Sequence, residues 1–218
     1  WFIGQPIDNN NDNRVYYDYH FLGIWQLADS LDAKRYAQVP GQIRVEDVNG
    51  DGKINEADKI IVGNNYPKWT GSWNTRLDWK SFDFAMQVYT RRGFTVSDGF
   101  INSNSTLAGR YNGIRVNYWT PANPSNSDPR PNKNQENPIY GGTRSYEDGS
   151  FTKIRNVTLG WQVPTRFVSR TGAESVRLYG SIQNVATFTD FKGLDPEGRT
   201  SAGSPPNRAT LVGATFSF

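Results

Sequence analysis

The chain has 218 residues, with 24 basic and 21 acidic side chains and a formal net charge of +3. It contains no cysteine, which excludes disulfides, thiolate metal sites and cysteine nucleophiles. The basic residues are scattered, which does not indicate nucleic-acid binding. The single histidine, His20, lies in a polar stretch and is expected to be a solvated loop residue, which argues against zinc sites and histidine-dependent triads.

Aromatic residues reach 14% in a chain that is only 36% hydrophobic. Disordered chains are poor in aromatic residues, so the composition indicates a folded protein. No stretch approaches the roughly 18 apolar residues of a transmembrane helix, and no signal-peptide pattern opens the sequence. The start on Trp1 instead of methionine suggests a processed or truncated product.

Residues 47–58 carry the pattern of a calcium loop, D-x-N-x-D-G-x-I-x-x-x-D. Calcium takes roughly 6 to 8 oxygen ligands, and alternate residues of a tight loop point oxygens at one centre. We therefore expect a structural Ca²⁺ site. Its predicted ligands are the side chains of Asp47, Asn49, Asp51 and Asp58 and the backbone carbonyl of Lys53.

Two interpretations of this loop remain open: a site for Ca²⁺ or a similar hard cation, and an Asx-rich turn that holds no metal. Pro40 and Gly41 would break an entering helix, so a helix–loop–helix EF-hand is not expected. Gly52 permits the sharp turn, and Ile54 should pack the loop onto a small core of its own.

Strict alternation of apolar and polar residues begins at residue 69. In WTGSWNTRLDWK, residues 69–80, Trp73 and Leu77 share one face while Arg76 lies on the other. Residues 81–91, SFDFAMQVYTR, alternate in the same way and follow with almost no loop. The pattern predicts a tight hairpin of half-buried strands.

The same alternation returns at residues 151–163, 175–186 and 207–218. These strands reach the roughly 9 to 11 residues that a tilted strand needs to cross a bilayer. They are longer than the ordinary strand of about 5 to 6 residues.

Short and long connections alternate between the strands. Residues 80–81 and 164–174 are short links, whereas residues 6–68, 93–150 and 187–206 are long and rich in Asn, Gly, Pro and Ser. Outer-membrane barrels combine short periplasmic turns with long outer loops, while compact soluble domains rarely carry such long loops.

A soluble β-sandwich fits the strands alone. A barrel is favoured by three further features: tryptophans near strand ends, as in an aromatic girdle, small polar residues opposite the apolar face, and an aromatic last residue, Phe218. The girdle candidates are Trp69, Trp79 and Trp161.

Several loop residues are of types that could form a site. Loop aromatics could stack on sugars or on a partner protein, or could pack the loops themselves: Tyr16, Tyr17, Tyr19, Trp25, Tyr111, Tyr118 and Trp119. Arg91 and Arg92 are expected to be interfacial cations. Asp195 could be taken for a catalytic carboxylate, but its loop context, GLDPEG, argues against that role. We therefore expect no enzymatic activity.

The residues resemble a known family. PGQIRVEDVNGDGKINEADKIIVGNNYPKWTGSWNTRLDWKSFDFAMQV, residues 40–88, is similar to the C-terminal part of SusC/RagA-type TonB-dependent outer-membrane transporters of Bacteroidetes. Three further stretches agree in order, YDYHFLGIWQ at 17–26, SFTKIRNVTLGWQVP at 150–164 and VRLYGSIQNVATFTDFKGLDPEG at 176–198. The resemblance spans almost the whole chain.

The resemblance implies an all-β fold, namely the C-terminal strands of a transmembrane antiparallel barrel of about 22 strands with long extracellular loops. Residues 1–218 would supply its last five or six strands, with WFIGQ ending one of them. The expected order is an extracellular loop with the calcium-like site (6–68), a hairpin (69–92), a second extracellular loop (93–150), a second hairpin (151–186), a third extracellular loop (187–206) and the final strand (207–218).

The resemblance also implies function and partners. It implies import of glycans or peptides across the outer membrane, with a SusD-like surface lipoprotein on the extracellular loops and with TonB contacted through an N-terminal part outside this chain. Phe218 would belong to the signal that the barrel-assembly machinery reads, and the apolar face would contact outer-membrane lipid. The alternative is a soluble, calcium-stabilised β module of a secreted glycan-binding protein.

Overall fold

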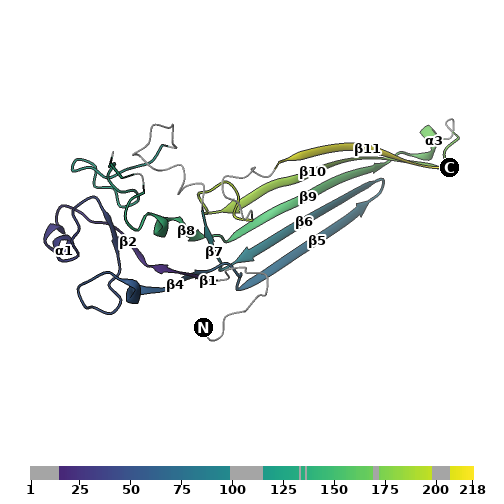
Figure 1. The fold of residues 1–218 in the computed structure, drawn as a ribbon. Helices are drawn as coiled ribbons and strands as arrows, with labels where there is room; N and C mark the ends of the chain where they lie inside the picture. Colours follow the sequence, from purple (N-terminus) through teal and green to yellow (C-terminus); the bar gives the residue numbers. More distant parts are fainter. Residues whose placement is uncertain (1–14, 99–114, 133, 136, 169–171, 198–206) are drawn as a thin grey trace. The chain divides into compact units, whose positions relative to one another are not determined.

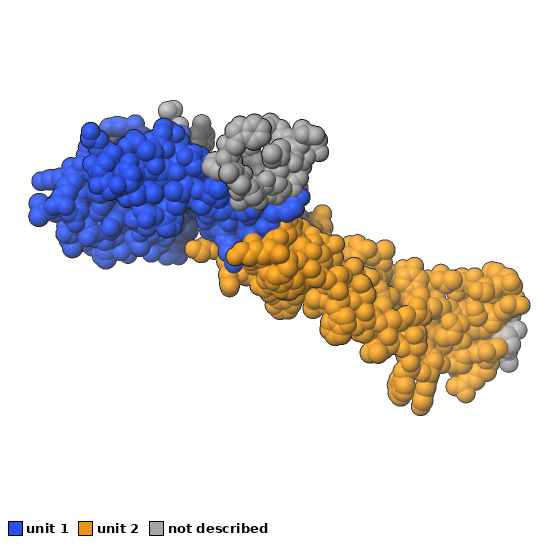
Figure 2. All heavy atoms as spheres, turned by 90° about the horizontal axis from the view of Figure 1, so that it is seen from below, with its two compact units in different colours: residues 1–66, 94–148, 198–203 blue, residues 67–93, 149–197, 204–218 orange. Residues whose placement is uncertain are grey.

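In a computed structural model of the chain, the described residues are 15–98, 115–132, 134–135, 137–168, 172–197 and 207–218. The strand end expected at WFIGQ and the loop residue Tyr111 lie outside these residues. The chain divides into two compact units, which are coloured separately in Figure 2. We call them the sheet unit (residues 67–93, 149–197 and 204–218) and the loop unit (residues 1–66, 94–148 and 198–203), and each is described by itself.

The sheet unit is built on one five-stranded antiparallel sheet of order β11-β10-β9-β6-β5, visible in Figure 1. Its strands are β5 (Trp69–Trp79), β6 (Phe82–Arg92), β9 (Phe151–Gln162), β10 (Ser175–Thr189) and β11 (Ala209–Ser217). All five strands that the alternation predicts are therefore confirmed, and β10 runs three residues past the predicted end at 186.

The short links join strands on one end of the sheet. Lys80, in the left-handed region with φ of 54°, turns the chain from β5 into β6. The link between β9 and β10 contains the short helix α3 (Thr165–Val168), where Val168 packs with Ala173 and Val176. Strand β5 pairs with β6 from Trp69–Arg92 to Trp79–Phe82 without a register shift, as a tight hairpin requires.

A β-bulge in β9 sets which side chains reach each face. Gln87 of β6 pairs with Asn156, but its neighbour Val88 pairs with Ile154, so Arg155 is an extra residue in β9. A bulge of this kind reverses the alternation beyond it. Ile154 therefore lies on the face of Val88, and Lys153 lies on the opposite face beside Tyr89.

The loop unit contains secondary structure inside the segments predicted as long loops. Three antiparallel strand pairs form it: β1 (Val15–Tyr19) with β4 (Lys59–Asn64), β2 (Phe21–Ile24) with β3 (Ile43–Val45), and β7 (Thr95–Ser97) with β8 (Tyr146–Asp148). The helix α1 (Ser30–Arg35) and the 3-10 helices η1 (Glu56–Asp58) and η2 (Gly141–Ser145) complete it. The long connections thus fold together and are not structureless.

The loop unit has its own small hydrophobic core. Ile24, Ile43, Val45 and Trp119 are buried together, and Ile54 packs against them from the calcium-like loop, as the sequence predicts. Trp119 comes from the second long connection, so the core joins segments far apart in the chain.

Gly160 is a position at which the sheet has little room for added volume. A Cβ atom at Gly160 would overlap the Asp83 carboxylate and the Arg177 guanidinium, whereas one at Gly180 would have only the Leu211 carbonyl, at 4.0 Å, near it. In the full-length protein, we expect Gly160→Ala to destabilise the sheet by about 1–3 kcal/mol. The matched control Gly180→Ala should leave stability unchanged. Thermal unfolding in detergent measures both, and equal stability of the two variants would contradict this packing.

Candidate functional site

The sheet has one continuous apolar face. Cross-strand pairs such as Trp73–Val88, Phe84–Leu159 and Leu178–Trp161 place apolar side chains opposite one another from edge to edge. The face comprises Trp73, Leu77, Trp79, Phe82, Phe84, Met86, Val88, Ile154, Val157, Leu159, Trp161, Val176, Leu178, Ile182, Val212 and Phe216.

Large side chains of this face are open to their surroundings: Trp73 is 63% exposed, Leu77 61% and Val212 87%. An exposed apolar surface of this extent is the signature of contact with lipid or with another protein. The predicted girdle residues Trp69 and Trp79 begin and end β5, and Trp161 is the penultimate residue of β9.

The middle of the opposite face is polar and, apart from Arg76 on the edge strand β5, uncharged. The Ser181 hydroxyl donates to the Asn156 side-chain oxygen at 2.8 Å and is 2.9 Å from the Thr158 hydroxyl. Gln87 and Gln183 are the cross-strand partners of Asn156. Such a surface can hydrogen-bond to water or to a polar solute without fixing a charge.

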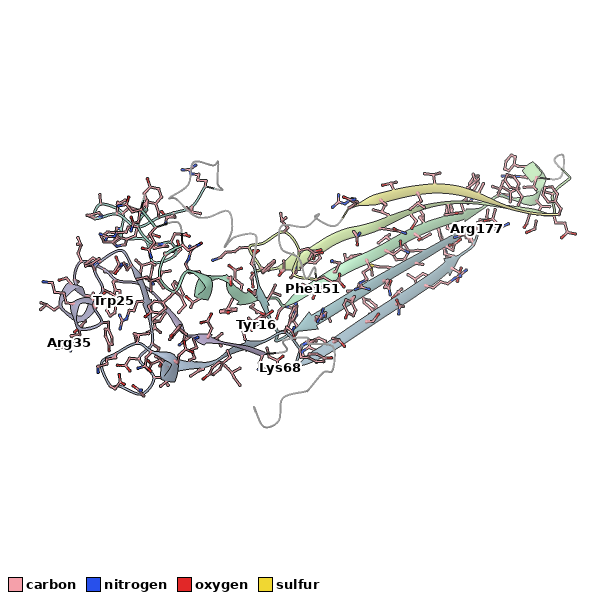
Figure 3. All side chains as sticks on the ribbon, viewed as in Figure 1. Tyr16, Trp25, Arg35, Lys68, Phe151 and Arg177 are labelled. Atoms are coloured by element: carbon pink, nitrogen blue, oxygen red, sulfur yellow. The ribbon has the colours of Figure 1, made fainter. Side chains whose placement is uncertain are left out.

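An ion pair lies toward the short-link end of this polar face, near Arg177 in Figure 3. The Arg177 guanidinium donates to both carboxylate oxygens of Asp83, at 2.8 and 2.5 Å. Gly160 lies between their strands and leaves the space that the pair occupies. Nearby, Arg76 donates to Asp78 at 3.1 Å, in a pair that is largely exposed.

A second charged cluster lies toward the long-connection end of the polar face, where Figure 3 labels Phe151. Lys153 Nζ is 2.7 Å from a Glu197 carboxylate oxygen and 3.4 Å from Asp195, and Arg155 donates to the other oxygen of Glu197. Burial alone would raise the pKa of Glu197, but the hydrogen bond and charge of Lys153, together with Arg155, hold that pKa below its usual range. Glu197 is therefore a carboxylate at neutral pH.

The sequence alone does not predict this cluster. From the sequence, Asp195 is expected to be an ordinary loop carboxylate, whereas the structure pairs it with Lys153. A signal was present: Lys153 and Arg155 interrupt the apolar alternation of β9, and two acids follow in GLDPEG. What hid the pairing is the bulge at Arg155, because it decides the face that these cations reach.

The calcium-like loop is organised by hydrogen bonds to its acidic side chains. Asp47 accepts the backbone N–H groups of Gly50 and Gly52, each at 2.8 Å, and Asp51 accepts that of Lys53 at 2.8 Å. Asn49 accepts the N–H of Asp51 at 2.9 Å. Burial would raise the pKa of Asp47, but its backbone hydrogen bonds with Gly52 and Gly50 lower it below the ordinary value.

Asp58 differs from the other predicted ligands because it is fully buried. Its oxygens accept the backbone N–H groups of Val48 and Asn55, at 3.0 and 2.8 Å. Together with Asn55 it forms a capping box at the start of η1. The loop is entered from β3 and left through η1, so the prediction that it is not a helix–loop–helix is confirmed.

Among the residues that the structure describes, no three or more His, Cys, Asp or Glu side chains gather where they could hold a metal ion. Hydrogen bonding does not use up the oxygens of Asp47 and Asp51, since a carboxylate has about four lone-pair sites. The assignment of Ca²⁺ to Asp47, Asn49, Asp51, Lys53 and Asp58 stays a prediction.

Some of the loop aromatics pack inside the loop unit and others are exposed at its surface. Trp25 and Trp119 are buried, and the ring of Tyr16 packs against Tyr146 at 5.1 Å between centroids. Tyr17 and Tyr118 remain 48% and 40% exposed and are the candidates for contact with a ligand. Packing of the loops thus accounts for the two tryptophans.

The remaining predicted positions are at the surface. His20 is half exposed and lies 2.7 Å from the Glu46 carboxylate, which agrees with a solvated histidine. The Arg92 guanidinium donates to the Thr152 hydroxyl at 2.9 Å. Phe218 directly follows β11 and is 84% exposed.

Within the described part of the chain, no helix is long and apolar enough to span a membrane.

Long antiparallel strands with an apolar face and a polar face are the arrangement expected of a segment of a transmembrane β-barrel wall. No family model matches the sequence. Comparison with curated proteins finds TonB-dependent receptor P3 of Formosa agariphila, 28% identical over 204 residues, which cover 92% of this chain and 20% of that protein. TonB-dependent receptor P26 of the same organism is 27% identical over 182 residues, covering 82% of this chain and 18% of that protein.

The fold matches solved structures of an importer. The RagAB peptide importer in its open-open state has a TM-score of 0.69 at 18% identity, over 100% of this chain and 25% of that chain. The closed-closed state gives a TM-score of 0.67 at 20% identity, over 98% of this chain and 25% of that chain. These similarities support the resemblance of this chain to a segment of a SusC/RagA-type TonB-dependent transporter. The chain spans about a fifth of the curated relatives' length, 20% for P3.

Asp58 provides a test of the loop's hydrogen-bond network. Asp58→Ala removes the acceptor for backbone N–H groups of the loop, and we expect a local loss of about 1–3 kcal/mol. Hydrogen exchange of residues 47–58, measured in the full-length protein with a chelator present, should rise accordingly. Glu56→Ala is the control, because the Glu56 side chain is 81% exposed. Equal exchange in both variants would show that Asp58 does not organise the loop.

Proposed function

We propose that the protein to which this chain contributes imports a nutrient through an outer-membrane β-barrel, with energy delivered through TonB. The observation that carries the proposal is the two-faced sheet: its apolar face suits lipid and its polar face suits a water-filled interior. TonB is proposed as the energy source because the relatives are named TonB-dependent receptors. Named as receptors and importers, the relatives also agree with a function that is not enzymatic.

The substrate class in this proposal is a glycan or a peptide. This substrate class is favoured because the fold matches that of an importer described as a peptide importer. The uncharged middle of the polar face, with Asn156, Thr158 and Ser181, suits amide and hydroxyl groups alike. The proposed partner is a SusD-like surface lipoprotein, which would contact the long connections.

The proposed orientation places the short links in the periplasm and the long connections outside. It follows from the usual arrangement of outer-membrane barrels. The loop unit would then be extracellular, and Phe218 would end the last strand at the periplasmic side, where the barrel-assembly machinery reads it.

Detergent dependence tests the barrel assignment. We expect the full-length protein to fractionate with outer membranes, to require detergent for solubility and to migrate differently in electrophoresis before and after heating. The physical reason is that the apolar face would otherwise meet water. A chain of residues 1–218 that is monomeric and soluble without detergent would instead support the secreted, calcium-stabilised β module.

We also propose that Ca²⁺ braces the loop of residues 47–58. The motif spacing supports this, and Asp51 is exposed while Asp47 is partly exposed. Its role would be structural, because a cation held by several loop oxygens restricts the backbone.

Metal removal tests this site in the full-length protein. We expect chelation to raise hydrogen exchange in residues 40–66 while the five long strands of the sheet unit keep their protection, and we expect added Ca²⁺ to reverse this rise. Asp51→Asn should weaken the response, whereas Asp32→Asn, an exposed acid in α1, should not. Unchanged protection of the loop on chelation would rule out the calcium site.

A further inference from the structure

The segment of residues 190–197, which we call the strap, is fastened to the polar face of the sheet. It directly follows β10, and its acids Asp195 and Glu197 meet Lys153 of β9. The Lys153 side chain is only 3% exposed, and Pro196 of the strap is buried. The strap therefore covers this part of the polar face.

The fastening consists of two cations that share one carboxylate. Glu197 accepts from Lys153 through one oxygen, at 2.7 Å, and from Arg155 through the other. Asp195 adds a longer contact with Lys153, at 3.4 Å, and accepts the backbone N–H of Glu197 at 3.0 Å. Glu197 is thus the central anchor and Asp195 the auxiliary one.

Aromatic rings hold the two cations in place. Lys153 Nζ lies 5.4 Å from the centroid of the Phe151 ring, and the Arg155 guanidinium lies 4.1 Å from that of Tyr89. Phe151 is completely buried, and its ring centroid is 6.0 Å from that of Tyr89. The cations therefore have little freedom to follow the strap if it leaves.

The strap is also tied where it begins. The Thr189 hydroxyl donates to the Ser150 carbonyl at 2.8 Å and accepts the N–H of Phe191 at 3.1 Å. The strap therefore has a fixed start and an ion-pair network centred on the buried Lys153 side chain, whereas Glu197 and Arg155 are partly exposed. Release of the strap would leave the Lys153 ammonium without its carboxylate partners, so release is disfavoured.

We propose that Lys153 is a positioning residue that keeps the strap as a fixed constriction on the interior side of the barrel wall, limiting the size of solutes that reach the polar face. The constriction lies toward the long-connection end, where β9 begins and β6 ends. Its role in solute passage rests on the proposed transport function, whereas the fastening itself does not.

The fastening is tested by spin labelling the full-length protein at Leu194→Cys, an exposed site in the strap. We expect restricted motion of the label. Lys153→Met and Glu197→Gln should each release the strap, increase the motion of the label and raise hydrogen exchange of residues 190–197 by at least about tenfold. Asp195→Asn should have a smaller effect, and Lys80→Met, at the far short link, should have none. A strap that stays equally protected in Lys153→Met and in Glu197→Gln would overturn the fastening.

The constriction is tested by thiol labelling of Gln183→Cys on the polar face, with a small methanethiosulfonate and a bulky polyethylene-glycol maleimide. We expect the bulky reagent to label Cys at this position more slowly than the small reagent does. Glu197→Gln should raise the labelling rate of the bulky reagent several-fold and leave that of the small reagent unchanged. A released strap with an unaltered rate ratio would refute the size limit. If the strap is fastened but the protein is soluble without detergent, the transport function fails and the fastening stands.

Discussion

The cross-strand register of the five-stranded sheet is the constraint on which the other features of the sheet unit depend. Side chains alternate with a period of two residues, so a slip of one residue in any strand would carry its apolar set to the polar face. The pairs Trp73–Val88 and Met86–Val157 show the correct register across three strands. One apolar surface results, and with it the contact with lipid that a barrel wall needs.

The bulge at Arg155 shows how this constraint accommodates charge. Without the extra residue, Lys153 would lie on the apolar face, where an ammonium group in lipid is costly. With it, Ile154 joins the apolar face and Lys153 turns toward the acids of the strap. The bulge thus serves the lipid face and the interior face at once. Gly160 also serves the interior face, because its missing side chain gives the Asp83–Arg177 pair its space.

The sequence predicts the strands well because each long strand repeats one simple rule. The alternation in residues 69–80 predicts the strand that the structure has as β5. The short link at residues 80–81 predicts the tight turn found at Lys80. The loop unit was not predictable in the same way. Its strands are as short as the three residues of β3, and its core depends on Trp119, which comes from another connection.

The candidate sites also differ in whether they depend on local sequence or on contacts between distant residues. The motif at residues 47–58 is local, so its turn and the inward position of Ile54 follow from the sequence. The buried role of Asp58 as a cap for backbone N–H groups does not follow from spacing alone. The pairing of Lys153 with Glu197 joins residues far apart in the chain and depends on a register shift, which composition and periodicity do not encode.

Accessibility of alternate residues along β5 tests the two-faced wall most directly. Nitroxide labels placed singly at residues 72–77 of the full-length protein, in lipid bilayers, would be measured for collision with oxygen and with a water-soluble nickel chelate. Labels at Trp73 and Leu77 should favour oxygen, and labels at Ser72, Asn74 and Arg76 should favour the chelate. A strand without this period of two, or with the two faces exchanged, would contradict the barrel-wall account.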